Sequence, residues 1–172
     1  MKRIELHPEP LSGSAFAPFG DVIDIAGRAA RWINDGTCER FDDLAQVDVS
    51  ADGGRPLISI FRAAPRSLPF EIRSLERHPL SSQAFYPLQP QPFLIVVAQE
   101  GSGEMAARVR AFVSNGRQGV NFRRNTWHHE LLAMHQSSLF LVVDRGGPGE
   151  NCESIAVDGR PVRVNELPSG SR

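Results

Sequence analysis

The chain has 172 residues, a formal net charge of −1 at pH 7, and 41% hydrophobic residues. This length predicts a single domain over residues 1–172 with a core of its own. The balanced charge and the lack of an apolar run of ~20 residues argue against binding to nucleic acid or insertion into a membrane. The only cysteines, Cys38 and Cys152, lie in unlike contexts, which indicates a reducing, cytoplasmic setting rather than a disulfide framework.

The expected elements are mainly short strands bounded by Gly, Pro, Asn or Asp. A short helix over residues 12–20 comes first, with a serine at its start and a glycine at its end. Residues 42–46 give a second, weaker indication of helix. The expected strands cover residues 21–25, 46–49, 56–61, 71–77, 84–88, 93–99, 108–114, 119–122 and 138–144. The polar residues 34–40 are expected to form a loop over the mouth of a barrel, and residues 168–172 a frayed tail.

Two of these segments, residues 93–98 and 139–143, are continuous apolar runs. Such runs are typical of strands that are covered on both faces or that line a barrel. Many short strands at ~8–12-residue spacing, with few helices, favour a sandwich or a jelly roll. We therefore expect an all-β fold with a few short helices.

Glu76, His78 and Gln83 form the first candidate constellation. Glu76 and His78 are two positions apart, so on an extended strand they point to the same face. Carboxylate, imidazole and amide groups are ligands of divalent metals. Without a metal, the same groups could supply a general base and hydrogen bonds to a substrate. The alternative is a solvent-exposed strand face that carries polar residues and has no site.

The second candidate segment is the run GVNFRRNTWHH over residues 119–129. If it is extended, His128 and His129 face opposite ways, so only one of them enters the interior easily. We expect His128 to join the site and His129 to be a hydrogen-bonded structural histidine. Trp127 could wall a pocket, although a large aromatic residue is more often part of the core.

Arginines near these segments could bind an anionic substrate through a forked pair of hydrogen bonds, although a single arginine is more often a surface charge. They are Arg62, Arg77, Arg123 and Arg124. Lys2 is the only lysine, which argues against Schiff-base chemistry. The chain has no G-x-S-x-G elbow, glycine-rich phosphate loop or C-x-x-C pair.

The two candidate segments resemble the two half-motifs of a cupin. Glu76, His78 and Gln83 stand where cupins place H-x-H-x(3–4)-E, and residues 119–128 stand where they place the second motif. More broadly, residues 16–147 resemble the ureidoglycolate lyase family, with residues 119–129 as the most specific run. The segments that carry this resemblance are residues 16–23, 39–45, 57–63, 75–80, 83–85, 115–121, 124–129 and 144–147.

The resemblance implies a cupin-like double-stranded β-helix (jelly roll), a homodimer, and cleavage of (S)-ureidoglycolate to glyoxylate and urea in allantoin breakdown. It also implies a divalent metal such as nickel, manganese or zinc, and no redox cofactor. The chain departs from the general cupin pattern because Glu76 replaces the first histidine and Gln83 the glutamate. A metal-independent site therefore stays open as an alternative.

For this activity we expect Glu76, His78 and His128 to be catalytic, and these three with Gln83 to ligate any metal. Gln83 would also contact the substrate. We further expect Arg62 or Arg124 to hold the substrate carboxylate and Asn121 to bind the ureido carbonyl. The competing hypotheses are another small-molecule cupin enzyme, such as an isomerase or dioxygenase, and a non-catalytic metabolite-binding β-barrel.

Overall fold

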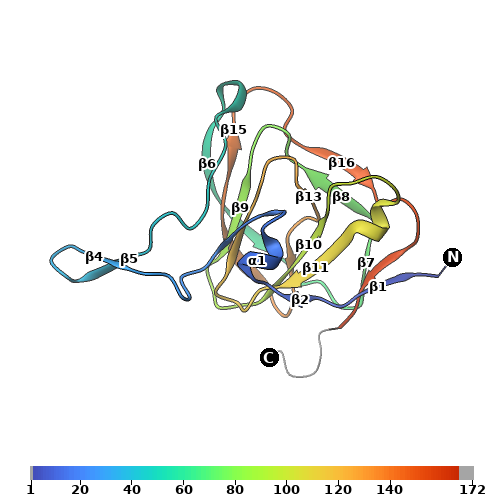
Figure 1. The fold of residues 1–172 in the computed structure, drawn as a ribbon, viewed down its shortest axis with the longest axis horizontal. Helices are drawn as coiled ribbons and strands as arrows, with labels where there is room; N and C mark the ends of the chain where they lie inside the picture. The colour runs from blue at the N-terminus through green and yellow to red at the C-terminus, as the bar shows by residue number, and fades with distance from the viewer. Residues whose placement is uncertain (1, 167–172) are drawn as a thin grey trace.

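The computed structural model describes residues 2–166, and these residues are almost entirely strands and turns (Figure 1). The expected tail over residues 168–172 lies outside the described residues. Within the described residues, helical structure is confined to α1 (Gly13–Phe16) and to two 3₁₀ turns, Ala51–Gly53 and Met105–Arg108. No helix within residues 2–166 is long and apolar enough to cross a membrane.

The strands form sheets that pack face to face. A seven-stranded sheet contains β16 (Glu153–Ala156), β8 (Ser74–Arg77), β13 (Trp127–His128), β10 (Phe93–Ala98), β11 (Val109–Val113), β2 (Glu9–Pro10) and β14 (Leu132–Ala133). A five-stranded sheet contains β3 (Gly20–Ile23), β12 (Gly119–Phe122), β9 (Gln83–Pro87), β15 (Ser138–Gly146) and β6 (Arg55–Ala63). A three-stranded sheet contains β1 (Ile4–Leu6), β17 (Val162–Val164) and β7 (Phe70–Ile72). The all-β prediction is confirmed, with a cupin-like β-sandwich.

The alternation of side chains along β10 divides the core into two clusters. Phe93, Ile95 and Val97 point into a cluster shared with the five-stranded sheet. Leu94 and Val96 point the other way, into a cluster shared with the three-stranded sheet. This two-sided packing explains why all six residues of β10 are buried, as the continuous apolar run predicts.

Two expected elements differ from the structure in instructive ways. Residues 71–77 form two strands rather than one, because pairing is interrupted at Arg73 and β7 and β8 belong to different sheets. The helix predicted from Ser12 does begin there, with the Ser12 hydroxyl accepting a hydrogen bond from the Ala15 amide at 3.3 Å. It ends at Phe16, ahead of Pro18, which cannot donate a backbone hydrogen bond.

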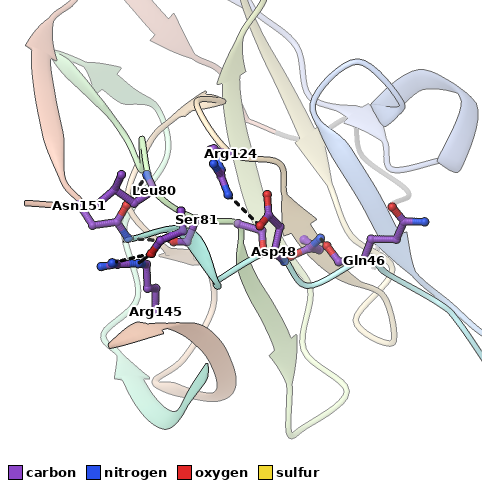
Figure 2. Close-up of polar contacts among 10 residues, drawn as sticks. Gln46, Asp48, Leu80, Ser81, Arg124, Arg145 and Asn151 are labelled. Carbon is purple, nitrogen blue, oxygen red and sulfur yellow. Dashed lines mark hydrogen bonds and ion pairs between the residues drawn. The ribbon is translucent and has the colours of Figure 1, made fainter. Parts of the chain in front are cut away.

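Residues 42–49 form neither the helix nor the strand that was expected. Asp43 has a positive φ of 54°, which interrupts any helix at that point. Farther along, side chains hold the segment instead of a strand ladder. The Asn121 amide donates to the Gln46 carbonyl at 2.9 Å, and the Asp48 amide donates to the Ser82 hydroxyl at 2.8 Å. Figure 2 shows Gln46 and Asp48 along this segment.

Residues 34–40 belong to a hairpin, not to a loop over the site. The hairpin joins β4 (Arg31–Ile33) to β5 (Cys38–Arg40). Asn34 and Asp35 take φ values of 53° and 55° at its tip, a conformation that Asn and Asp adopt more readily than most residues. The hairpin projects away from the body, on the opposite side of the view from β8 and β13 (Figure 1).

Candidate functional site

Four predicted site residues meet between the two larger sheets. Glu76 lies on β8 and is paired in register with His128 on β13, while His78 follows β8 and Gln83 begins β9. One ligand atom from each of Glu76, His78 and His128 lies within 4.8 Å of the others. The His78 Nε2 atom is 3.1 Å from Gln83 Oε1 and 3.9 Å from Glu76 Oε1.

The fold fixes which nitrogen of each imidazole faces this cluster. The Nδ1 atom of His78 lies 2.6 Å from the Asn151 carbonyl oxygen, and that of His128 lies 3.1 Å from its neighbour's carbonyl oxygen. A carbonyl oxygen can only accept, so each neutral ring carries its proton on Nδ1 and keeps a lone pair on Nε2. Both lone pairs are therefore available to a proton or a metal ion.

His128 is held as a neutral base inside the protein. It is only 1% exposed, and the Phe122 ring stacks on it with centroids 4.1 Å apart. Burial, followed by the nearby charge of His78, lowers the pKa of His128 to about 3. Its Nε2 atom is buried and has no hydrogen-bond partner among residues 2–166. A buried nitrogen in this state indicates a ligand that the protein itself does not supply.

The donor set fits a divalent metal ion. Ligands that share one ion at about 2.1 Å lie about 3–4 Å from each other, and the 3.1 and 3.9 Å separations around His78 Nε2 agree with this spacing. Two acceptors as close as His78 Nε2 and Gln83 Oε1 favour a shared cation, or a Gln83 amide turned so that its NH₂ group faces the ring. Glu76, His78 and His128 could thus hold a metal ion, with Gln83 as a fourth ligand.

A pocket of about 250 Å³ gives access to the cluster from outside. Its lining includes His78 and Gln83 and adds residues that the sequence patterns did not identify; the lining residues are His78, Ser81, Gln83, Asp144, Arg145, Asn151 and Cys152. Burial raises the pKa of Asp144, an effect that the nearby His78 and the Gln83 amide partly offset. Burial and the neighbouring Glu76 carboxylate raise the pKa of the Cys152 thiol.

Asn151 holds the loop that carries His78. Its carbonyl oxygen accepts from the His78 ring, its Oδ1 accepts from the Leu80 amide at 2.7 Å, and its Nδ2 donates to the Ser81 hydroxyl at 2.8 Å. The side-chain contacts of Asn151 with Leu80 and Ser81 appear in Figure 2. Asn151 is therefore a positioning residue for the imidazole, although it lies 73 positions away in the sequence.

Two other predicted substrate contacts lie elsewhere. Arg62 is exposed and is the register partner of Leu139 on β15. Leu139 lies five positions from the pocket residue Asp144, a distance of about 17 Å along the strand. Asn121 lies next to Phe122 on β12, so its side chain points to the opposite face of the sheet. There its amide donates to the Asp21 carboxylate at 3.0 Å.

Arg124 lies closer to the site but already has a partner. The backbone amide of the next residue, Asn125, donates to the His78 carbonyl at 3.1 Å. The Arg124 guanidinium forms an ion pair with Asp48 at 2.8 Å (Figure 2). Arg124 is therefore adjacent to the His78 loop, with its charge directed to the segment before β6.

The two other residues of the second motif have the structural roles that were expected. His129 Nδ1 lies 3.0 Å from the Glu130 carbonyl oxygen, and the ring packs against Phe70 with centroids 5.4 Å apart. Trp127 packs against the core cluster shared with the three-stranded sheet, with the Arg77 guanidinium 4.6 Å from its ring. Of the two adjacent histidines, only His128 enters the candidate site, where Phe122 stacks on its ring.

Comparison with known proteins gives one consistent result. A family model described as ureidoglycolate lyase matches residues 3–165. A ureidoglycolate lyase of Burkholderia mallei is 55% identical over 143 residues, which cover 83% of this chain and 84% of the relative. A ureidoglycolate lyase of Brucella anthropi is 49% identical over 156 residues, covering 91% and 92% of the two chains. Ureidoglycolate lyase 1 of Rhizobium meliloti is 49% identical over 150 residues, covering 87% and 88%.

Proposed function

Because the chain belongs to the ureidoglycolate lyase family, we propose that it cleaves (S)-ureidoglycolate into glyoxylate and urea. This reaction would make it a carbon–nitrogen lyase of the amidine-lyase class. The observation that carries the proposal is the family match over residues 3–165. The site supports it, because His78 lines the pocket and lies in one cluster with Glu76 and His128.

The reaction requires removal of one proton from the substrate hydroxyl group and delivery of one proton to the leaving nitrogen. In ureidoglycolate the hydroxyl group and a ureido nitrogen are bonded to the same carbon. Removal of the hydroxyl proton allows the oxygen to form a C=O bond while the carbon–nitrogen bond breaks, and the nitrogen takes up a proton to leave as urea. General acid–base catalysis of this kind typically contributes about 10²–10⁴-fold.

In a metal-free site we assign the general base to His78. Its Nε2 lone pair faces the cluster, and its side chain lines the pocket that the substrate would enter. The pKa of His128, about 3, makes that ring a weak base, so His128 would instead accept a hydrogen bond or ligate a metal. Glu76, 3.9 Å from His78 Nε2, would stabilise the imidazolium that forms.

If the enzyme uses a metal, Glu76, His78, Gln83 and His128 would hold it. Two imidazoles, a carboxylate and an amide suit nickel, manganese or zinc. Such an ion supplies a Lewis acid that lowers the pKa of a bound hydroxyl. The protein's own contribution is then to fix the ring orientations through the two carbonyl oxygens described above.

We retain Arg124 as the partner of the substrate carboxylate, because it lies beside the His78 loop. It would exchange the Asp48 carboxylate for that of the substrate. Neither Arg62 nor Asn121 is retained, since the first lies along the strand from the pocket and the second faces the other side of the sheet.

We also propose that the enzyme is a homodimer and works in the cytoplasm, late in allantoin breakdown. The outer face of the five-stranded sheet supports the dimer. Ile58 and Ile60 are 77% and 55% exposed on the edge strand β6, and their register partners Val143 and Leu141 extend the same apolar face. Light scattering should give twice the mass of one chain, and Ile58→Lys together with Ile60→Lys should give monomers.

A product assay tests the proposed function. Purified enzyme and (S)-ureidoglycolate should yield urea and glyoxylate in equal amounts. Ammonia and carbon dioxide in place of urea would show an amidohydrolase, oxygen uptake would show a dioxygenase, and binding without turnover would show a metabolite-binding protein. Any of these three results would replace the proposal.

A further inference from the structure

Asp144 brings into the pocket a carboxylate that the reaction above does not use. It lines the pocket together with His78 and Gln83, and its Oδ1 atom is buried with no hydrogen-bond partner among residues 2–166. Burying a carboxylate oxygen without a donor costs free energy. The Gln83 amide lies beside this carboxylate, and Oδ1 stays open to a donor that arrives with a ligand.

The strand register explains why this carboxylate faces the cluster. On β15, Val143 pairs with Ala84 of β9, so the next positions in antiparallel order bring Asp144 beside Gln83. On the other edge of β9, Gln83 pairs with Phe122 of β12. Directly opposed residues point to the same face, which forms a row of Phe122, Gln83 and Asp144.

This row has imidazole groups at one end and a carboxylate at the other. Phe122 stacks on His128 at one end, and Gln83 contacts His78 in the middle. Asp144 at the other end offers only acceptors when ionised. A ligand group that pairs with the ionised carboxylate donates hydrogen bonds and is not an anion. In ureidoglycolate the ureido group has N–H donors, whereas the glyoxylate half carries the negative charge.

We propose that Asp144 accepts N–H hydrogen bonds from the ureido group and thereby selects and orients the substrate. This inference rests on the proposed function and names the residue that recognises the urea half. The ureido group lies toward Asp144, and the carbon that carries the hydroxyl group lies toward the imidazoles. The carboxylate of the substrate is kept away from Asp144 by repulsion.

The test separates the two halves of the substrate. Inhibition by urea and inhibition by glyoxylate are measured separately for the unaltered protein and for Asp144→Asn, which keeps the side-chain shape but loses the charge. We expect kcat/KM to fall about 10–100-fold and the inhibition constant of urea to rise about tenfold, because a charged hydrogen bond is lost. The inhibition constant of glyoxylate should stay within about twofold. The matched control is Asp35→Asn at the exposed hairpin tip, which should change none of these values.

Three results would overturn the inference. Equal losses for urea and glyoxylate would show a general disturbance of the pocket, and no loss for either would show that Asp144 contacts neither. Inhibition of the unaltered protein by acetone as strong as that by urea would show that N–H donors are not recognised, because acetone has the shape of urea without them. This last comparison needs no variant, so it stands even if Asp144→Asn fails to fold.

Direct binding distinguishes this inference from the proposed function. Ligand-observed NMR can follow urea and acetone on the unaltered protein without turnover. If ureidoglycolate is not cleaved, the proposed function fails. Selective binding of urea that is lost in Asp144→Asn would then still support the recognition role.

Discussion

The two sides of the seven-stranded sheet are built from the same alternating strands but have different contents. One side packs against the three-stranded sheet and is an apolar cluster around Leu75 and Val96. The other side is apolar around Val97 and Phe140 but becomes polar at β8 and β13, where Glu76 and His128 meet. Neighbouring residues thus contribute to packing or to the candidate site according to the face they occupy. Substitutions on the two faces, and at the surface for contrast, test this division.

The largest expected effect is on the pH dependence of stability, through His128. Its pKa is about 3 in the folded protein and about 6.5 when unfolded. Between these two pH values the unfolded chain binds a proton at His128 that the folded protein does not. The free energy of unfolding is therefore at its full value above pH 6.5 and decreases as the pH falls toward 3. The loss amounts to at most about 5 kcal/mol.

Thermal denaturation of metal-stripped protein between pH 7.5 and 4 measures this loss, since urea is itself a proposed ligand of the pocket. His128→Gln should flatten the profile, because glutamine does not titrate. An equally steep profile in this variant would show that other groups cause the acid sensitivity.

The second prediction contrasts two adjacent residues on opposite faces of β8. Leu75 is 2% exposed, so Leu75→Ala should lower the free energy of unfolding by about 2–5 kcal/mol through lost contacts and a cavity. Glu76→Gln keeps the side-chain volume and should lower kcat/KM far more than stability. Denaturant titration and steady-state kinetics on both variants measure the two quantities. Similar profiles for both would contradict the division between faces.

The third prediction compares His78, which faces the candidate site, with His129, which packs against Phe70. His78→Ala should lower kcat/KM by about 100-fold or more, because the proposed base or metal ligand is removed. His129→Ala should affect stability more than turnover, since its ring packs on Phe70. Kinetics at matched concentrations of folded protein measure both. Unchanged turnover in His78→Ala would remove His78 from the mechanism.

The smallest expected effect lies at the surface. The Arg124 and Asp48 side chains are 32% and 51% exposed, and their ion pair spans 2.8 Å. Because exposed ion pairs contribute little, Asp48→Asn should lower the free energy of unfolding by less than about 1 kcal/mol. If Arg124 binds the substrate carboxylate, freeing its guanidinium from Asp48 should leave KM unchanged or lower it. A large rise in KM, measured by steady-state kinetics, would argue against that role.

The sequence predicted site residues that belong to a motif better than site residues that do not. The spacing of Glu76 and His78 placed them on one face of a strand, and they do meet His128. Asp144 and Asn151 reach the pocket from β15 and the following loop through tertiary contacts alone. Local patterns carry no signal for such contacts, apart from the position of Asp144 at the end of a strong apolar run.

The differences in fold have equally specific causes. Residues 46–49 belong to no strand, and side chains such as Ser82 take the place of a partner strand. Propensity cannot distinguish these two ways of satisfying the backbone. The position of Asn121 depends on the register of β12, in which a shift of one residue reverses the face.

Main-chain oxygen atoms, rather than side chains, orient both imidazoles of the cluster. A point mutation can replace a side-chain acceptor, but it cannot delete a peptide carbonyl. The direction in which each ring presents its free electron pair is thus inherited with the course of the backbone. Substitutions at the pocket rim can therefore alter which molecules bind while the proton-accepting direction of the rings is preserved.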